Sequence, residues 1–242
     1  MSEWIAALPM YDWPECRQDT DAQWQGWRDA LRRRGVDAPQ ALTRTGDLQA
    51  LWRHPNLLLA QTCWGPMEAG LAGHVRVVGQ PDYSAYEGGE GAYYSSAILM
   101  RKDVAGQEMA EPDMAAPEDG RARLSPDLMR GKRLAYNEAL SRSGFLALIH
   151  DLKEVGEAAD LFAGKLETGG HRASLEAVRD GRADVCAVDC RSWAMAQRLV
   201  PGVGNLRVVG WTARRLGLPY ITSRYAKDSL VERIRESVIL NE

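Results

Sequence analysis

Short, continuously apolar segments alternate along the chain with segments whose apolar residues recur every three or four positions. The first pattern is typical of buried β-strands and the second of amphipathic helices. Residues 56–61, with three consecutive leucines, illustrate the first pattern, and residues 228–240 illustrate the second. Strands that are apolar at every position belong to parallel sheets, because both of their faces are covered. The alternation of the two patterns predicts an α/β fold.

The predicted strands share an apolar run bounded by Gly, Pro or polar turn residues. They lie at or near residues 4–10, 38–43, 56–61, 74–79, 93–101, 132–136, 165–168, 183–189, 206–211 and 218–222. The predicted helices cover residues 47–52, 144–152, 173–180, 192–199 and 228–240, and one more runs from an N-cap at Thr20 or Asp21 to Gly35.

Residues 103–127 interrupt this alternation. They are rich in Gly, Pro, Ala, Met and acidic residues without a period, so we expect a surface excursion that is mobile in part. The α/β pattern restarts at Lys132. Because 242 residues suffice for two lobes of roughly 100 residues each, the pattern predicts two Rossmann-like α/β lobes.

The charge balance and the apolar runs narrow the classes of function. Thirty Lys and Arg residues face 33 Asp and Glu residues, for a net charge of −3, so we expect no nucleic-acid partner. No apolar run approaches the roughly 18 residues that span a bilayer, so we expect a protein that is not membrane-embedded. The first ten residues lack the basic and apolar regions of a signal peptide. Two locations stay open: periplasmic, if a leader has been removed, or cytoplasmic.

The cysteines and the known catalytic motifs give little sign of a metal, a cofactor or a reaction. Cys16, Cys63, Cys186 and Cys190 form no C-x-x-C pair, so we expect free thiols, with a Cys16–Cys63 disulfide as the alternative. The chain has no H-E-x-x-H, G-x-S-x-G, Walker A or G-x-G-x-x-G sequence. We therefore expect no metal, no cofactor and no enzymatic activity, although an enzyme is not excluded.

A polar turn between the strand at residues 132–136 and the helix at residues 144–152 is the first candidate site. A helix start exposes backbone N–H groups with partial positive charge, which suits an anion. Ser141 and Ser143 add hydroxyl donors, and Gly144 lets an oxyanion approach the backbone. The alternative is that Ser141 or Ser143 only caps the helix.

Polar residues also follow the other buried strands of the predicted sheets. The carboxyl ends of parallel strands converge on one crevice, where ligands bind. The sequence therefore predicts a ligand site at these strand ends, although some members are ordinary turn residues. The predicted ligand-binding residues are Tyr11, Asp12, Gln61, Thr62, Ser95, Ser96, Asn137, Ser141, Ser143, Gly144, His171 and Asp189.

Two members of this set have competing interpretations. His171 follows two glycines, so it either caps a helix, lies on the surface or holds an oxyanion. Asp189 ends an apolar strand, so it either caps the helix that starts at Ser192 or accepts hydrogen bonds from a ligand. As a pair across a cleft, the two side chains could bind an amine or a hydroxyl group.

Seven segments together resemble the phosphate/phosphonate-type substrate-binding proteins of ABC transporters. The segments are Met10-Tyr11-Asp12, LLAQTC at residues 58–63, YSSAI at residues 94–98, Asn137-x-x-x-Ser141-x-Ser143-Gly144, GHxxSLxAVxxGxAD at residues 170–184, Gly210-Trp211-Thr212 and Gly217-Leu218-Pro219-Tyr220. The chain departs from the family at Trp64-Gly65-Pro66, where members usually have Gly-Tyr/Phe-Pro, so we expect a remodelled cleft wall.

The resemblance implies the type II periplasmic-binding-protein fold, in which two crossing strands join two lobes and the ligand binds in the interlobe cleft. Carried over, the crossings lie near residues 96–101 and 210–218. Lobe 1 would comprise residues 1–97 and 212–242, and lobe 2 residues 98–211. The Ser-x-Ser-Gly turn would hold phosphonate or phosphate oxygens, with His171 and Asp189 on the ligand side of lobe 2.

The resemblance also implies a function: a solute-binding protein for a small phosphate- or phosphonate-like oxyanion, serving as the receptor of an ABC transport system with a permease as partner. Two alternatives on the same two-lobe fold stay open. One is a cytosolic enzyme that acts on a bound acid, and the other is a sensor that signals through a protein partner. The fold alone does not choose among them.

Overall fold

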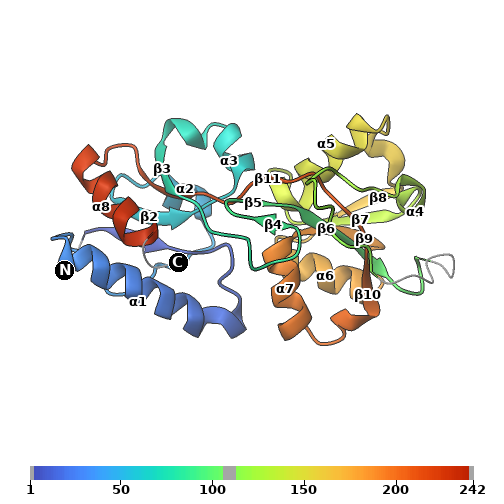
Figure 1. Cartoon of the computed structure of the whole chain (residues 1–242), viewed down its shortest axis with the longest axis horizontal. Helices are drawn as coiled ribbons and strands as arrows, with labels where there is room; N and C mark the ends of the chain where they lie inside the picture. Colours follow the sequence, from blue (N-terminus) through green and yellow to red (C-terminus); the bar gives the residue numbers. More distant parts are fainter. Residues whose placement is uncertain (1–2, 106–112, 240–242) are drawn as a thin grey trace. The chain divides into compact units, whose positions relative to one another are not determined.

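The structure of this chain is a computed structural model that describes residues 3–105 and 113–239 (Figure 1). The chain divides into two compact units, Met1–Pro81 with Gly217–Glu242 and Asp82–Leu216. Compared with the lobe boundaries expected from the sequence, this division places residues 82–97 and 212–216 in the second unit.

The first unit contains a four-stranded mixed sheet with the order β1-β2-β12-β3. β1 and β2 are parallel, and β12 is antiparallel to both of its neighbours. In chain order, this unit consists of β1 (Ile5–Ala7), η1 (Pro14–Cys16), α1 (Arg17–Arg33), α2 (Leu48–Trp52), β2 (Leu57–Gln61), α3 (Trp64–Glu68), η2 (Leu71–Gly73), β3 (Val75–Gly79), β12 (Tyr220–Ser223) and α8 (Asp228–Ile239).

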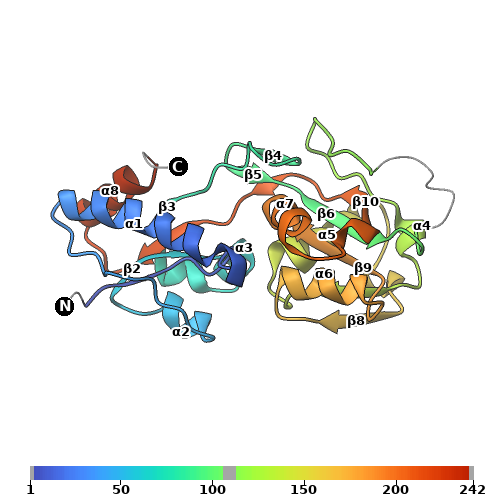
Figure 2. The same cartoon turned by 90° about the horizontal axis from the view of Figure 1, so that it is seen from below.

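Two hydrophobic clusters hold the helices of the first unit against its sheet. α1 and α8 lie side by side in both views (Figures 1 and 2). In their cluster Trp27 and Tyr220 meet edge to face, with ring centroids 5.1 Å apart. In the second cluster Trp52 of α2 and Met67 of α3 pack with Leu57 of β2. Both faces of β2 are thus covered, which explains why the strand is apolar throughout.

The second unit contains a five-stranded sheet with the order β10-β6-β9-β7-β8 and a small antiparallel sheet with the order β11-β5-β4. β7, β8 and β9 are parallel, whereas β6 and β10 are antiparallel to their neighbours. In chain order, this unit consists of β4 (Gly89–Glu90), β5 (Tyr93–Tyr94), β6 (Ser96–Arg101), α4 (Pro126–Met129), β7 (Arg133–Tyr136), η4 (Arg142–Leu146), α5 (Ala147–Glu154), η5 (Ala159–Leu161), β8 (Gly164–Glu167), α6 (His171–Arg179), β9 (Val185–Asp189), α7 (Cys190–Leu199), η6 (Val203–Asn205), β10 (Leu206–Trp211) and β11 (Arg215–Leu216).

Helices cover the larger sheet of this unit. α6 contacts β6, β7 and β9, and α7 contacts β6 and β9. A hydrophobic cluster joins Leu148 and Leu152 of α5 to Leu134 of β7 and Val185 of β9. The helices predicted at residues 144–152, 173–180 and 192–199 are confirmed. The first corresponds to η4 followed by α5, and α6 and α7 each start two residues earlier than predicted, at 171 and 190.

The excursion predicted at residues 103–127 falls partly outside the described residues, since residues 106–112 are not described. Its later part is attached to β10. Met114 N–H donates to Val208 O at 3.1 Å, Trp211 Nε1 donates to Met114 O at 2.7 Å, and Arg123 pairs with Trp211 as an isolated bridge. Residues 113–123 therefore cover the exposed edge of a strand, a common protection against unwanted pairing.

The predicted strand at residues 38–43 is wrong, because side chains of α1 occupy its carbonyl groups. Trp24 Nε1 donates to Pro39 O, and Arg32 Nη2 donates to Ala38 O at 2.7 Å. Thr43 N–H still reaches Ala6 O at 2.7 Å, but no strand forms. α1 also begins before the predicted cap, at Arg17, so Thr20 lies inside the helix and its Oγ1 donates to Cys16 O, one turn back.

The single strand predicted at residues 93–101 is two strands in different sheets. Ser95 N–H donates to Gly88 O at 2.7 Å, and Ser95 O accepts from Cys190 N–H at 3.1 Å. These bonds turn the chain between β5 and β6. All four cysteines are free, so the Cys16–Cys63 disulfide is wrong, and burial raises the pKa values of the Cys186 and Cys190 thiols.

Candidate functional site

The turn between β7 and α5 is a π-helical turn, η4. Leu146 N–H donates to Ser141 O, five residues back, at 2.9 Å, and Ser141 Oγ accepts from Gly144 N–H at 3.1 Å. The capping interpretation of Ser141 is confirmed. Such π-turns are rare in proteins, but those that occur are often found at functional sites. As at any helix start, the first N–H groups lack partners within the helix, so the turn can still present donors to an anion.

Gly144 is required by the packing of this turn. A Cβ atom added to it would lie 2.5 Å from Asn137 Oδ1 and 3.0 Å from Ser141 Oγ. Asn137 follows β7, and its Oδ1 is buried without a hydrogen-bond partner among the described residues. The sequence thus brings Asn137, Ser141 and Gly144 together as predicted, and the small residue allows the close approach.

Ser143, His171 and Asp189 meet next to the turn. Ser143 Oγ lies 2.8 Å from His171 Nε2, and the same nitrogen lies 3.1 Å from Asp189 Oδ2. The side chains of His171 and Asp189 are 11% and 1% exposed. His171 Nδ1 is buried and, within the described part of the chain, has no hydrogen-bond partner. Residues from two other elements, Ser143 of η4 and Asp189 of β9, therefore converge on one ring nitrogen of His171 in α6.

Asp189 is held as an anion by its protein partners. Its Oδ1 accepts from Ser192 N–H at 2.9 Å and its Oδ2 from Ser192 Oγ at 2.6 Å, so it caps α7. Burial alone would raise the pKa of Asp189, but the hydrogen bond and charge of His171, together with the hydrogen bonds of Ser192, lower it. The capping interpretation of Asp189 is therefore confirmed, and the carboxylate also contacts His171, whereas a hydrogen bond from a ligand to Asp189 stays a prediction.

Ser95 and Ser96 adjoin this cluster. Ser96 begins β6 and lies opposite Asp189 in the β6–β9 ladder. Ser96 Oγ is buried, and no hydrogen-bond partner for it exists among residues 3–105 and 113–239. The eight predicted residues of the second unit, from Ser95 to Asp189, thus gather at one end of its larger sheet.

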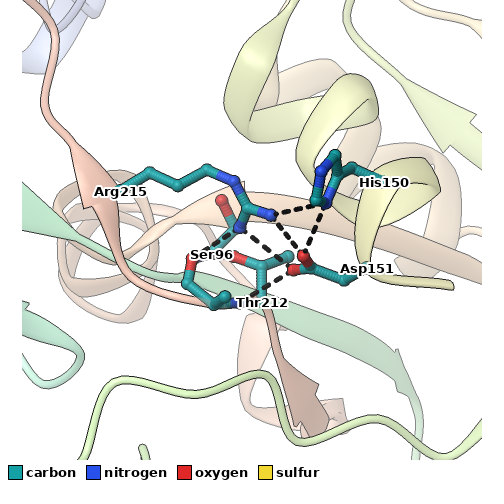
Figure 3. Close-up of polar contacts among 6 residues, drawn as sticks. Ser96, His150, Asp151, Thr212 and Arg215 are labelled. Atoms are coloured by element: carbon teal, nitrogen blue, oxygen red, sulfur yellow. Dashed lines mark hydrogen bonds and ion pairs between the residues drawn. The ribbon is translucent and has the colours of Figure 1, made fainter. Parts of the chain in front are cut away.

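An ion-pair cluster that the sequence reasoning missed lies near Ser96 (Figure 3). Asp151 of α5 is 3% exposed and accepts from Ala213 N–H at 2.8 Å and from Arg215 Nη1 at 3.0 Å, both at Oδ2. Arg215 Nη2 contacts Oδ1 as well, so the pairing is two-pronged. His150 Nδ1 lies 3.4 Å from Oδ1. The available signal was Asp151's place on the apolar face of the helix, four residues after Ala147.

In the first unit, the structure pairs Asp12 with Arg44. Arg44 Nε lies 2.6 Å from Asp12 Oδ2 and Nη2 lies 3.1 Å from Oδ1, while Nη2 also reaches Asp21 Oδ1 at 2.9 Å. The hydrogen bond with Asp12 is the main cause of a raised pKa of Arg44. A hollow of about 180 Å³ adjoins the pair and is lined in part by Arg17 and Thr45. The Asp12 carboxylate is therefore engaged by a protein cation.

The other predicted residues of the first unit are buried at the ends of its strands. Tyr11 is 5% exposed, Gln61 3% and Thr62 fully buried. Gln61 Nε2 donates to Leu218 O at 3.3 Å, whereas Thr62 Oγ1 is without a hydrogen-bond partner within the described residues. Of these three residues, Thr62 is the one whose buried hydroxyl lacks a hydrogen bond within the described residues.

Neither a metal centre nor a membrane span stands out in the described residues. Residues 3–105 and 113–239 contain no group of three or more His, Cys, Asp or Glu side chains placed to hold a metal ion. In the same residues, no helix has both the length and the apolar character needed to cross a bilayer.

Comparison with known proteins connects these observations to a family. Residues 49–239 match the family described as "ABC transporter, phosphonate, periplasmic substrate-binding protein". The comparison with curated proteins gives no match.

Several solved structures are similar along nearly the whole chain. XAC2383 from Xanthomonas citri, bound to chloride ion, is 17% identical with a TM-score of 0.67, over 99% of this chain and 84% of that one. PhnD1 from Prochlorococcus marinus, in complex with methylphosphonate, is 14% identical with a TM-score of 0.67, over 97% and 83%. A binding protein component of an ABC phosphonate transporter (PA3383) from Pseudomonas aeruginosa is 13% identical with a TM-score of 0.64, over 96% and 72%. At these identities the likeness shows the fold, and the predicted two-lobe α/β fold is confirmed.

Proposed function

Because the chain belongs to the periplasmic substrate-binding proteins of ABC phosphonate transporters, we propose that it binds a small phosphonate- or phosphate-like oxyanion at the π-turn of its second unit. The family assignment makes the chain a solute-binding protein. The position of the ligand and its chemical class are the proposal.

The convergence of Ser143 and His171 on the start of a helix carries this proposal. Ser143 Oγ and His171 Nε2 lie 2.8 Å apart, within hydrogen-bonding distance of each other, so one small oxyanion near the turn would be close to both and would exchange this contact for its own. Helix N–H donors, a hydroxyl and an imidazole together form a set that suits phosphonate oxygens. Gly144 fits this turn because Asn137 Oδ1 and Ser141 Oγ already occupy its Cβ position, and the approach of an oxyanion to its backbone stays a prediction.

The remaining residues have supporting parts in this proposal. Ser141 shapes the turn through its bond to Gly144 N–H, and Asp189 orients the His171 ring. Buried polar atoms without protein partners are the best candidates for further ligand contacts, because leaving them unsatisfied costs free energy. In the described residues of the second unit this class includes Ser96 Oγ, Asn137 Oδ1 and His171 Nδ1. Tyr11, Asp12, Gln61, Thr62 and Ser95 stay predictions.

The geometry of the cluster supports binding rather than catalysis. In a Ser-His-Asp triad, the serine and the aspartate contact opposite ring nitrogens of the histidine, so that one nitrogen takes the serine proton while the other is held by the carboxylate. Here Ser143 and Asp189 both contact Nε2. In this arrangement no carboxylate holds the ring nitrogen opposite the serine, as activation of a serine nucleophile requires. The geometry therefore favours a receptor that returns its ligand unchanged over an enzyme on the same fold.

Members of this family are periplasmic and serve ABC transporters. We therefore propose a periplasmic location and an ABC permease as the partner of this chain. Localisation of the full-length protein in its cells by fractionation would test the location, and crosslinking to a membrane permease would test the partner.

Isothermal titration calorimetry with methylphosphonate, inorganic phosphate and sulfate tests the ligand class. We expect saturable binding of methylphosphonate or phosphate with a stoichiometry of one, and weaker binding of sulfate. Recovery of the ligand unchanged after long incubation would separate a receptor from an enzyme. Binding of none of these anions would contradict the proposed ligand class.

A further inference from the structure

Asp151 is mechanically connected to the proposed anion site, because it lies on the helix that the π-turn begins. α5 continues directly from η4, and Asp151 lies eight residues after Ser143. At about 1.5 Å per residue this places the two residues about 12 Å apart along one helix. A helix is stiff over this length, so whatever fixes Asp151 also fixes the orientation of the Ser143 end.

Asp151 is fixed to the segment that follows β10, and this segment is in turn fixed to β6. The carboxylate accepts from Ala213 N–H at 2.8 Å. The neighbouring Thr212 bonds Ser96 in both directions: Thr212 N–H donates to Ser96 O at 2.9 Å, and Ser96 N–H donates to Thr212 Oγ1 at 2.8 Å. Thr212 and Ser96 are 1% and 0% exposed, so water does not compete for these bonds.

The connection then returns to the anion site across the sheet. Ser96 pairs with Asp189 in the β6–β9 ladder. Asp189 contacts His171, and His171 contacts Ser143. The contacts therefore form a closed circuit at the end of the sheet, from Ser143 through α5 to Asp151 and back through Ser96 and His171. Asp151 is the residue through which α5 takes part in this circuit.

The buried Asp151–Arg215 ion pair is better explained by the orientation that it gives to α5 than by a gain in folding free energy. The side chains of Asp151 and Arg215 are 3% and 17% exposed, so both groups have lost most of their hydration. The attraction in a buried pair often only offsets this desolvation, and apolar replacements can be as stable. A two-pronged Arg–carboxylate pair does, however, fix both distance and orientation.

We propose that Asp151 and Arg215 are positioning residues, which hold α5 so that Ser143 and His171 face the same oxyanion. This inference rests on the proposed function, since it assumes that the anion binds at the π-turn. Neither residue touches the ligand in this proposal. Binding sites commonly need such support, because donors displaced by a fraction of an ångström lose much of their effect.

The test compares substitutions at the pair with a matched control elsewhere in the same unit. Asp151→Asn keeps an acceptor for Ala213 N–H but removes the ion pair, Arg215→Lys keeps the charge but not the fork, and Arg215→Met removes both. Arg101→Met is the control. Arg101 is 19% exposed and donates to Val178 O at 2.8 Å and Ala183 O at 3.1 Å, at the far end of β6 from Ser96.

Three measurements are made on the full chain: melting temperature by calorimetry, affinity for methylphosphonate well below the lowest melting temperature, and the ring ¹⁵N resonances of His171. We expect Asp151→Asn and Arg215→Met to weaken binding about 10- to 100-fold, as loss of supporting residues does around metal ligands. Arg215→Lys should recover part of the affinity. Arg101→Met should lower the melting temperature and leave the affinity unchanged.

The ring resonances of His171 provide a readout that needs no ligand. They should shift in Asp151→Asn and Arg215→Met and stay in place in Arg101→Met. If the unaltered protein binds neither methylphosphonate nor phosphate, the proposed function fails, while the His171 shifts still decide whether the pair positions the cluster. If the protein binds, but the pair variants match the control in affinity and in His171 resonances, the pair is structural only and the inference is overturned. Should Asp151→Asn not fold, the two Arg215 variants decide the question.

Discussion

Replacing Gly144 with alanine is expected to damage both the π-turn and the binding of an oxyanion. The added Cβ would lie 2.5 Å from Asn137 Oδ1, 2.9 Å from Asn137 Cγ and 3.0 Å from Ser141 Oγ. The Asn137 backbone and the Ser141 side chain are both held, since Asn137 O accepts from Gly169 N–H at 2.8 Å and Ser141 Oγ accepts from Gly144 N–H. Relief of the clash therefore moves the buried Asn137 side chain or the backbone of the turn.

The sign of the stability change makes this substitution informative. Without a clash, Gly→Ala at a helical position stabilises a protein by about 0.4–1 kcal/mol, because it restricts the unfolded chain. Overpacking costs about 1–3 kcal/mol, and loss of a serine cap costs about 1 kcal/mol. We expect a net destabilisation of about 1–3 kcal/mol and at least a tenfold loss of affinity for methylphosphonate.

Gly170→Ala provides the matched control. Gly170 precedes His171, has an extended backbone with φ of −176°, and nothing lies within 4 Å of its Cβ position. Urea denaturation gives the free energy of unfolding of both variants, and titration calorimetry gives their affinities. The reasoning is refuted if Gly144→Ala is as stable as Gly170→Ala and binds methylphosphonate with unchanged affinity.

Two further predictions concern the same cluster. Ser143→Leu should weaken binding of methylphosphonate about ten- to a hundredfold in calorimetry, because it removes a charge-assisted hydrogen bond worth about 1.5–3 kcal/mol and blocks the turn; an unchanged dissociation constant would place the anion elsewhere. The lowered pKa of Asp189 means that its contribution to stability is complete above its unfolded value of about 3.9 and disappears as the pH falls through the lower folded value. Asp189→Asn should therefore cost stability at pH 6 and progressively less below pH 4 in urea denaturation; a cost that does not depend on pH would rule out an ionised Asp189.

The sequence was informative where one pattern dominated. The five consecutively buried residues of β2 and the periodic α8 were predicted close to their observed bounds, because burial on both faces leaves a continuous apolar run and burial on one face leaves a clear hydrophobic period. The polar turn after β7 was also predicted, because Ser141, Ser143 and Gly144 form a short polar segment between an apolar strand and an apolar helix.

Interactions between distant residues limited the rest. Arg215 meets Asp151 across 64 positions of sequence, and no local pattern specifies that partner. Arg44 meets Asp12 across 32 positions, so a carboxylate predicted to face a ligand also has a protein cation as its partner. Ser95 separates β5 from β6 because Gly88 and Cys190 bond its backbone, whereas the apolar run itself continues from β5 into β6. Side-chain partners of this kind are decided by the tertiary fold.

The most direct test of the proposed site is a titration of ¹⁵N-labelled protein with methylphosphonate, followed by ¹H–¹⁵N spectra. Binding at the π-turn predicts saturable shifts of the Arg142, Ser143 and Gly144 amides and of the His171 ring, all with one dissociation constant equal to the calorimetric one. Saturable binding that leaves these resonances in place would contradict the account.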